Sequence, residues 1–226
     1  LGLTGQRTRI VWDQVPSGTD AWNTKTGHLL KGFDTQGGDR TIHSGGTYGK
    51  PLLTHDGARV VYSSRENQSV WIVNWDGSGH RKICGGYAGD VWRDPNTGTE
   101  WVYVRPTFMT TDGGIVRYQV DNPSVSERIL STRVGLGTDN WSHPTVWFQV
   151  SADGKKAAGA NPWSSCGMFD LTTKVFTGYD GGCWTSICPD NSYRMWVYNN
   201  PHVSVDMFDA NKANKPTVQL GDGGDP

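Results

Sequence analysis

The side chains that could carry chemistry in this 226-residue chain are 22 acidic residues, six histidines and four cysteines. Their spacing marks no zinc site, because the sequence has no Cys-x-x-Cys pair and no His–Cys cluster of zinc spacing. It also has no His-Glu-x-x-His, nucleophile elbow, phosphate loop or dinucleotide fingerprint. A binding or catalytic site must therefore be assembled from residues that are distant in the sequence.

Two oxygen-based chemistries stay open. A glycosidase needs two carboxyl groups about 5 to 9.5 Å apart, and a Ca²⁺ site needs several oxygen ligands. The loop segments TTDGG and GTDN could hold Ca²⁺, and no other cofactor is expected. The acids that could form a glycosidase pair are Asp20, Asp90, Asp112, Asp139 and Asp180.

Composition excludes some partners. The net charge of −1 gives no electrostatic footprint for nucleic acid or an anionic membrane, and no apolar run approaches the roughly 18 residues of a membrane span. An even number of cysteines fits an oxidising compartment, although buried free thiols would look the same. We expect an extracytoplasmic protein (periplasmic, cell-surface or secreted), and the start at Leu1 rather than Met suggests a piece of a longer chain.

An aspartate that follows an apolar or aromatic residue recurs at intervals of 42, 45, 49 and 39 residues. Each copy ends a short apolar stretch and precedes a turn and another stretch, such as RKICG or KVFTGY. A second turn (HDG, DPNTG, ADG or PDN) precedes each of the last four copies, and its residues suit the positive φ of tight hairpins. We interpret these aspartates as turn-forming residues: Asp34, Asp76, Asp121, Asp170 and Asp209.

One repeat therefore holds four short strands in about 40 to 45 residues. No segment keeps apolar residues at helical spacing over three turns. This pattern predicts an all-β fold, a β-propeller of four-stranded antiparallel blades. A β-sandwich with coincidental spacing is the alternative.

The segment KPLLTHDGARVVYSSRENQSVWIVNWDGSGHRKICGG resembles the TolB-like, WD40-like (PD40) repeats of bacterial propellers. The pattern is also good in HPTVWFQVSADGKKAAGA, partial in SICPDNSYRMWVY and poor where Asp94-Pro95-Asn96 replaces the usual turn. The resemblance implies a fold and no particular activity. The matching elements are Pro51, the turn His55-Asp56-Gly57, Val60 to Ser63, Val70 to Asp76 and Arg81 to Cys84.

We expect a single propeller domain over residues 1–226, with blades near 1–46, 47–86, 87–134, 135–182 and 183–226. In the first blade only Leu1 to Gly5 stands where the innermost strand belongs. Propellers remove exposed edges by letting one terminus complete a blade begun by the other. We therefore expect a natural ring of five or six blades, of which part is missing here.

The loops of such a fold alternate between two faces. The turns within hairpins are short and form the short-turn face, whereas the loops between hairpins and between blades form the loop-rich face and include DQVPSGTDAWNTKTG and RPTFMTTDGG. Binding residues collect on long loops of a rigid scaffold. The predicted ligand-binding residues all lie on the loop-rich face: Lys50, Arg65, Asp90, Trp141, His143, Trp163, Trp184 and His202.

Four of these positions, near Lys50, Asp90, His143 and Trp184, should surround the mouth of the central channel. Tryptophan offers flat apolar area with a polar handle, although packing between blades is the alternative for the loop tryptophans. Cys166 and Cys183 fall on the same face of adjacent blades and could form a disulfide. Cys183 and Cys188 are poorer partners, because five extended residues span about 17 Å.

Three functions remain open. We expect a non-catalytic recognition module that binds a protein or a glycan. A carbohydrate-active enzyme is the first alternative. Some polysaccharide lyases with a TolB-like propeller use His, Arg and a bound cation, which here would be His143, His202 and Arg65. A structural or assembly domain of a larger secreted protein is the second.

Overall fold

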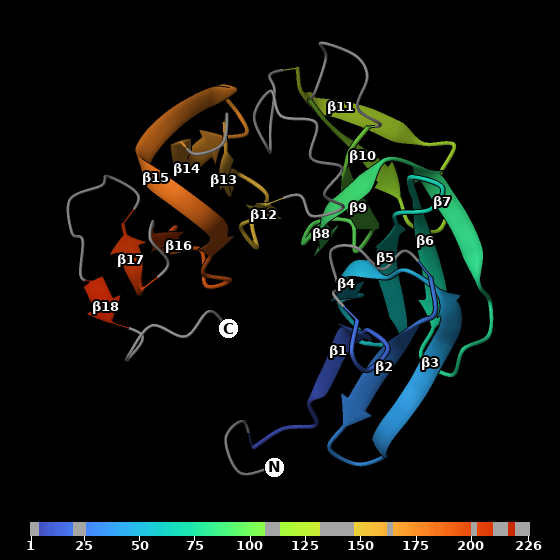
Figure 1. Ribbon diagram of the computed structural model, residues 1–226. Coiled ribbons are helices and arrows are strands. Elements are labelled where there is room, and N and C mark those ends of the chain that lie inside the picture. Colours follow the sequence, from blue (N-terminus) through green and yellow to red (C-terminus); the bar gives the residue numbers. More distant parts are fainter. Residues whose placement is uncertain are drawn as a thin grey trace.

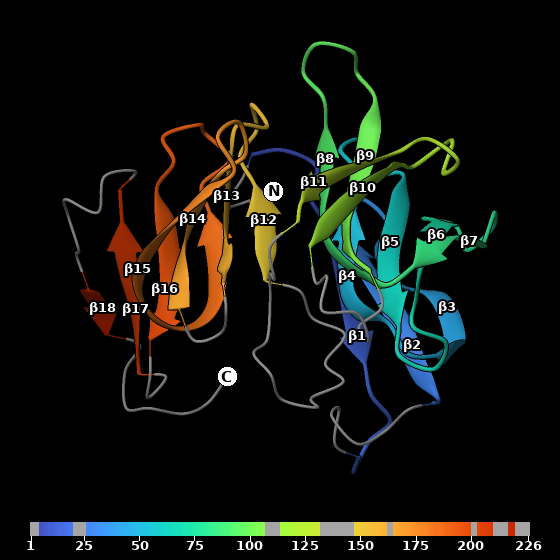
Figure 2. The same ribbon diagram turned by 90° about the horizontal axis from the view of Figure 1, so that it is seen from above.

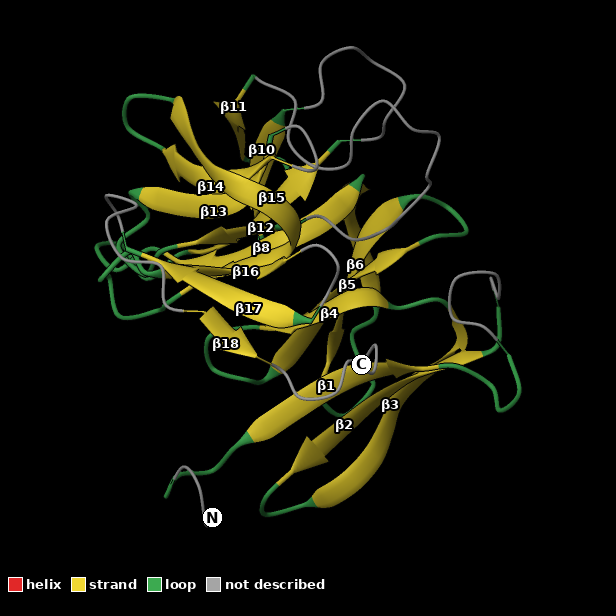
Figure 3. Ribbon diagram, turned by 60° about the vertical axis from the view of Figure 1, so that its left-hand side comes forward, coloured by secondary structure: helices red, strands yellow, loops and turns green. Residues whose placement is uncertain are grey.

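The computed structural model describes residues 5–19, 26–106, 114–131, 147–161, 165–199, 203–209 and 217–219. Every regular element within them is a β-strand (Figure 3). All strand pairs are antiparallel and join neighbours in the sequence. The predicted all-β architecture of four-stranded antiparallel sheets is therefore confirmed.

The strands form five units, which we number as sheets 1 to 5 in chain order (Figure 1). Sheet 1 has β1 (Arg9–Gln14), β2 (His28–Asp34) and β3 (Gly38–Gly46). Sheet 2 has β4 (Gly49–Leu53), β5 (Arg59–Ser64), β6 (Ser69–Asn74) and β7 (Arg81–Gly85). Sheet 3 has β8 (Tyr87–Arg93), β9 (Glu100–Arg105), β10 (Ile115–Gln119) and β11 (Ser126–Leu130).

Sheets 4 and 5 share one long strand. Sheet 4 has β12 (Phe148–Val150), β13 (Lys156–Ala160), β14 (Ser165–Asp170) and the first half of β15 (Val175–Ile187). The second half of β15 pairs with β16 (Met195–Asn199), which is followed by β17 (Ser204–Phe208) and β18 (Thr217–Gln219). The chain thus passes from the outer edge of sheet 4 to the inner edge of sheet 5 without a break.

Successive sheets stand side by side around an arc, with β4, β8 and β12 toward the middle (Figures 1 and 2). Each interface between them holds one cluster of buried apolar residues. In β5, Val60 and Tyr62 pack toward sheet 1 whereas Val61 packs toward sheet 3, because successive strand residues point to opposite faces. Both faces of sheets 2, 3 and 4 are therefore covered.

Sheet 1 has three strands within the described residues, and most of Leu1 to Gly5, where the sequence placed the innermost strand, lies outside them. No described segment pairs with the free edge of β1. Ring closure and the number of blades stay predictions.

The repeated aspartates occupy two different positions. Asp34 and Asp170 end their strands directly opposite Arg9 and Lys156, whereas Asp76 lies two residues beyond Asn74, the residue opposite Arg59. The turn-forming role is confirmed where a carboxylate accepts a backbone N–H two residues on: Asp34 from Gln36, Asp76 from Ser78 and Asp170 from Thr172.

The predicted Cys166–Cys183 disulfide is wrong. No disulfide joins any of the four cysteines, and Cys166 and Cys183 are buried. Cys166 in β14 lies opposite Asp180, and its Sγ donates a hydrogen bond to the carbonyl of Gly182 at 3.2 Å. Cys183 lies past the point where β15 leaves sheet 4, opposite Tyr198 of β16, so the strand carries it into the next sheet.

Candidate functional site at the mouth of the loop-rich face

Three of the innermost strands carry an irregularity in their pairing at the same point of the repeat. Strand pairing shifts between Gly49 and Leu52 in β4, between Ala88 and Asp90 in β8, and between Cys183 and Ser186 in β15. Such bulges bend the strand and redirect side chains, and they are frequent beside functional sites. The sequence repeat therefore includes a structural feature that faces the loop-rich side.

A hydrogen bond that closes the first turn of each repeat aligns these strands. Its donors are the backbone N–H groups of Thr54, Asp94, Ser151 and Cys188. Four residues before each donor lie Lys50, Asp90, Trp147 and Trp184, and we call these four residues the mouth. Three of them were predicted from the sequence, and Trp147 takes the place that we had assigned to His143.

Lys50 and Asp90 tie three sheets together. Lys50 Nζ donates to the carbonyl oxygen of Gly89 in sheet 3 at 2.5 Å. The carboxylate of Asp90 accepts from the N–H of Val91 at 2.9 Å and from the N–H of Val150 in sheet 4 at 2.8 Å. Both side chains therefore bridge to the backbone, mostly of the next innermost strand.

Burial moves the pKa values of this pair toward neutrality. It raises the pKa of Asp90 to about 6, against the opposing effects of the Val150 N–H and the charge of Lys50. It lowers the pKa of Lys50 to about 8, against the opposing charge of Asp90. Between about pH 6 and pH 8 both side chains are therefore charged. Their burial makes the charged forms less favourable than they would be in water.

The other half of the mouth is aromatic. Trp184 contacts Trp147 edge-on with ring centres 5.9 Å apart, and it contacts Tyr198 at 5.5 Å. Its side chain is 41% exposed, the largest exposed ring among the described residues. Trp184 also has a φ of 46°, as does Lys50. A bulky residue rarely adopts this left-handed conformation, and such strain is concentrated at functional sites.

The remaining predicted residues are dispersed or lie outside the described part. Arg65 follows β5, its N–H donates to Thr47 Oγ1 at 2.8 Å, and its charge acts on Tyr87 at the start of β8. The structure thus places Arg65 near sheet 3 and not at one of the four mouth positions. The predicted residues outside the described ranges are Trp141, His143, Trp163 and His202.

Sequence reasoning missed Gln149 of β12, whose Oε1 accepts hydrogen bonds from the N–H of Ile187 at 3.0 Å and from the hydroxyl of Ser186. Gln149 thus links sheet 4 to sheet 5, as Lys50 links sheet 2 to sheet 3 and Asp90 links sheet 3 to sheet 4. Trp147 could have been found by counting four residues back from the SADG turn. Gln149 carried no such signal, because a lone glutamine in a strand is usually solvated.

The described residues contain no cluster of three or more metal-ligating side chains. The GTDN loop and most of TTDGG lie outside the described ranges, so the predicted Ca²⁺ site stays a prediction. Both oxygens of Asp90 are committed to backbone donors. Of the four mouth residues, Trp184 is the exposed large apolar one, and its ring surface suits binding.

Comparisons with known proteins support the fold only. No protein-family model and no curated protein matches the sequence, so the TolB-like family resemblance is not confirmed. One similar structure is a nidogen/laminin complex, with a TM-score of 0.60, 12% identity, and 85% of this chain and 72% of that chain covered. Another is an oligogalacturonate lyase in complex with manganese, with a TM-score of 0.58, 15% identity, and 88% of this chain and 61% of that chain covered.

Both structures are propeller-like, which supports a β-propeller fold for this chain. The chain spans less than two thirds of the length of the lyase. One structure is a protein complex and the other an enzyme, so the fold does not choose between binding and catalysis. The described residues contain no helix long and apolar enough to cross a membrane.

Proposed function

We propose that this chain is a non-catalytic, extracytoplasmic recognition module that binds a protein or a glycan at the mouth of its loop-rich face. The observation that carries the proposal is Trp184, a strained and 41% exposed ring beside Trp147 and Tyr198. A flat apolar ring with an N–H donor suits either partner. Lys50 and Asp90, bonded to the backbone, hold the surrounding strands in place.

A carbohydrate-active enzyme is the second candidate. An oligogalacturonate lyase shares the fold, and displaced pKa values such as those of Lys50 and Asp90 are common in active sites. Against it, both carboxylate oxygens of Asp90 accept backbone hydrogen bonds. An assembly role in a larger secreted protein is the third candidate, and the nidogen/laminin complex is a structural neighbour in keeping with it.

A glycan array probed with the purified protein, with and without Ca²⁺, tests the proposal when bound signal and released products are read together. We expect Trp184→Ala to weaken binding at least about tenfold. Phe33→Ala is the matched control, because Phe33 is a 36% exposed ring in sheet 1, away from the mouth. Unchanged binding by Trp184→Ala would refute the mouth as the binding site. New reducing ends or unsaturated products would establish an enzyme, and silence on the array would direct the search to a protein partner.

A further inference from the structure

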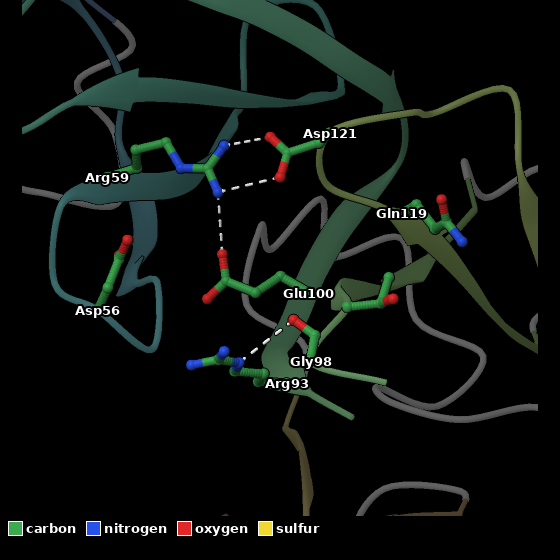
Figure 4. Close-up of a pocket in the computed structure, with 8 residues that line it drawn as sticks. Asp56, Arg59, Arg93, Gly98, Glu100, Gln119 and Asp121 are labelled. Atoms are coloured by element: carbon green, nitrogen blue, oxygen red, sulfur yellow. Dashed lines mark hydrogen bonds and ion pairs between the residues drawn. The ribbon is translucent and has the colours of Figure 1, made fainter. Parts of the chain in front are cut away.

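A cavity lies at the opposite ends of the strands that form the mouth. It has a volume of about 400 Å³ and opens on the short-turn face between sheets 2 and 3 (Figure 4). Pockets for small ligands usually measure about 300 to 1,000 Å³. Its lining comes from the HDG, DPNTG and VDN turns and the adjoining strand ends: Asp56, Arg59, Arg93, Gly98, Thr99, Glu100, Gln119 and Asp121.

The inner wall is an ion-paired network that joins the two sheets. Arg59 of β5 donates to Glu100 at 3.0 Å and to both oxygens of Asp121 (Figure 4). The other oxygen of Glu100 accepts from the N–H of His55 at 2.6 Å. The hydrogen bond with Asp121 raises the pKa of Arg59 further. The charge of Arg59 is therefore neutralised by its neighbours before any ligand arrives.

Three other polar groups of the lining retain binding capacity. Asp56 Oδ1 accepts from Thr54 Oγ1 at 2.7 Å and from the N–H of Ala58 at 2.9 Å, whereas its Oδ2 accepts no hydrogen bond from a described residue. Arg93 donates Nε to the carbonyl of Gly98 at 3.2 Å, and its two Nη groups have no hydrogen-bond partner among the described residues. The side-chain amide of Gln119 likewise has none within the described part of the chain.

The charges of the lining select the class of ligand. Three carboxylates face two guanidinium groups, an excess of one negative charge, and the hydrogen bonds to Asp56 lower its pKa so that it is ionised at neutral pH. A simple anion would meet the carboxylates, and a simple cation would meet Arg93. A molecule that carries both charges can satisfy both.

We propose that this cavity binds a small zwitterion of amino-acid or dipeptide size, with its ammonium group at Asp56 and its carboxylate at Arg93. The site is independent of the mouth, because it lies at the other ends of the strands and shares no residue with it.

The test is titration calorimetry of the whole chain with L-alanyl-L-alanine and L-alanine as zwitterions, ethylamine and acetate as single-charge probes, and glucose as a neutral polyol. We expect at least one zwitterion to bind saturably and at least about tenfold more tightly than the other three probes. Saturable binding of ethylamine, acetate or glucose at equal or greater strength would overturn the proposal. So would the absence of any saturable zwitterion binding up to about 50 mM, well above the millimolar range of weak sites.

Two variants and one control locate the binding. Asp56→Asn keeps the Oδ1 acceptor of the turn while it removes the charge, and Arg93→Gln removes the guanidinium from an exposed side chain. Each should weaken zwitterion binding at least about tenfold. Asp153→Asn should leave it unchanged, since Asp153 holds the equivalent turn in sheet 4, outside the cavity. Unchanged binding by folded Arg93→Gln would overturn the proposal even if Asp56→Asn unfolds.

Discussion

The interface between sheets 2 and 3 uses charged residues in opposite ways at its two ends. At the mouth, Lys50 and Asp90 are bonded mainly to backbone groups. At the short-turn face, Arg59 pairs side chain to side chain with Glu100 and Asp121. Burial moves the pKa values of the mouth residues toward neutrality, whereas pairing moves the pKa of Asp121 below its ordinary value.

This difference separates two roles of charge in one fold. A paired surface charge favours the folded state or is neutral to it, because the partner offsets the loss of water. A charge buried against backbone dipoles costs stability in its ionised form. The short-turn end thus holds the sheets together, and the mouth tolerates strain, as functional sites commonly do.

The largest difference between the two faces should appear in the backbone. Gly86 joins sheets 2 and 3 at the loop-rich face with a φ of 116°. A Cβ there would lie 2.7 Å from Val104 Cγ1 and closer still to the carbonyl oxygen of Arg105. Gly86→Ala should therefore lower the free energy of unfolding by at least about 3 kcal/mol, as measured by urea denaturation.

Gly38→Ala is the control for this change. Gly38 has a φ of 70° in the β2–β3 turn on the short-turn face, and a Cβ there would have no neighbour within 4 Å. We expect a cost of only about 1 kcal/mol. Equal costs at the two glycines would show that the mouth backbone is no tighter than that of the opposite face.

The next largest effect should be the pH dependence of Asp90. Folded Asp90 has a pKa of about 6 against an ordinary value of 3.8, so the native state binds its proton more tightly than the unfolded chain. Its contribution to stability is therefore present at low pH and is lost as pH rises from about 4 to about 6. In urea denaturation, the stability of Asp90→Asn relative to the wild type should rise by about 2–3 kcal/mol across this range.

Asp170→Asn should show the opposite pH dependence of stability. Lys156 holds the pKa of Asp170 well below its ordinary value, so this carboxylate contributes stability at neutral pH that is lost as pH falls below about 4. Asp170→Asn should therefore be less stable than the wild type at pH 7, and this difference in the free energy of unfolding should shrink only below about pH 4. If Asp90→Asn showed the same profile as Asp170→Asn, the contrast between buried and paired carboxylates would be wrong.

The ion pair of the short-turn face should give a smaller energy. The side chains of Arg59 and Glu100 are 22% and 10% exposed, so their pairing is only partly screened by solvent. A double-mutant cycle with Arg59→Ala and Glu100→Ala should give a coupling energy of about 1 kcal/mol in thermal or urea unfolding.

The Arg117–Glu127 pair is the comparison, because Glu127 is 54% exposed. Its coupling energy should stay below about 0.5 kcal/mol and vanish in high salt. A coupling at Arg59–Glu100 no larger than this would show that the inner wall of the cavity does not hold sheets 2 and 3 together.

The sequence predicted the strands better than the site. Alternating apolar residues and the HDG and ADG turns sufficed for the four-stranded sheets, because both signals are local. The aspartate repeat aligned residues that are not equivalent in the structure. Asp170 ends its strand whereas Asp76 lies two residues further on, in the turn, and the two look alike in sequence. The disulfide prediction failed because the sequence placed Cys166 and Cys183 only on the same face of adjacent blades. It could not show that Cys166 lies opposite Asp180 and hydrogen-bonds to Gly182, or that Cys183 lies opposite Tyr198.

The bulges at the mouth could not be predicted for a physical reason. Positive φ is expected from glycine or asparagine, and Lys50 and Trp184 carry no such signal. Their backbone conformation accompanies register shifts in the pairing of β4 with β5 and of β15 with β16, and no residue type marks such shifts in the sequence. The sequence therefore placed both residues on the correct face without showing the strain that distinguishes them.

That strain gives the smallest of the expected effects. Replacing Trp184 by Gly should yield a protein about 0.5–1 kcal/mol more stable than replacing it by Ala, because only glycine adopts a φ of 46° without cost. At Val175, a 56% exposed residue in the same strand whose φ is not positive, the order should reverse, because glycine weakens an ordinary strand. Thermal unfolding of the four variants measures both differences. If alanine is the more stable choice at both positions, the left-handed conformation costs nothing, and the case for a mouth held in a strained, preorganised state loses its energetic basis. If the order reverses as expected, the chain keeps a bulky residue in a backbone conformation that favours glycine, and binding by the exposed ring of Trp184 is the gain that offsets this strain.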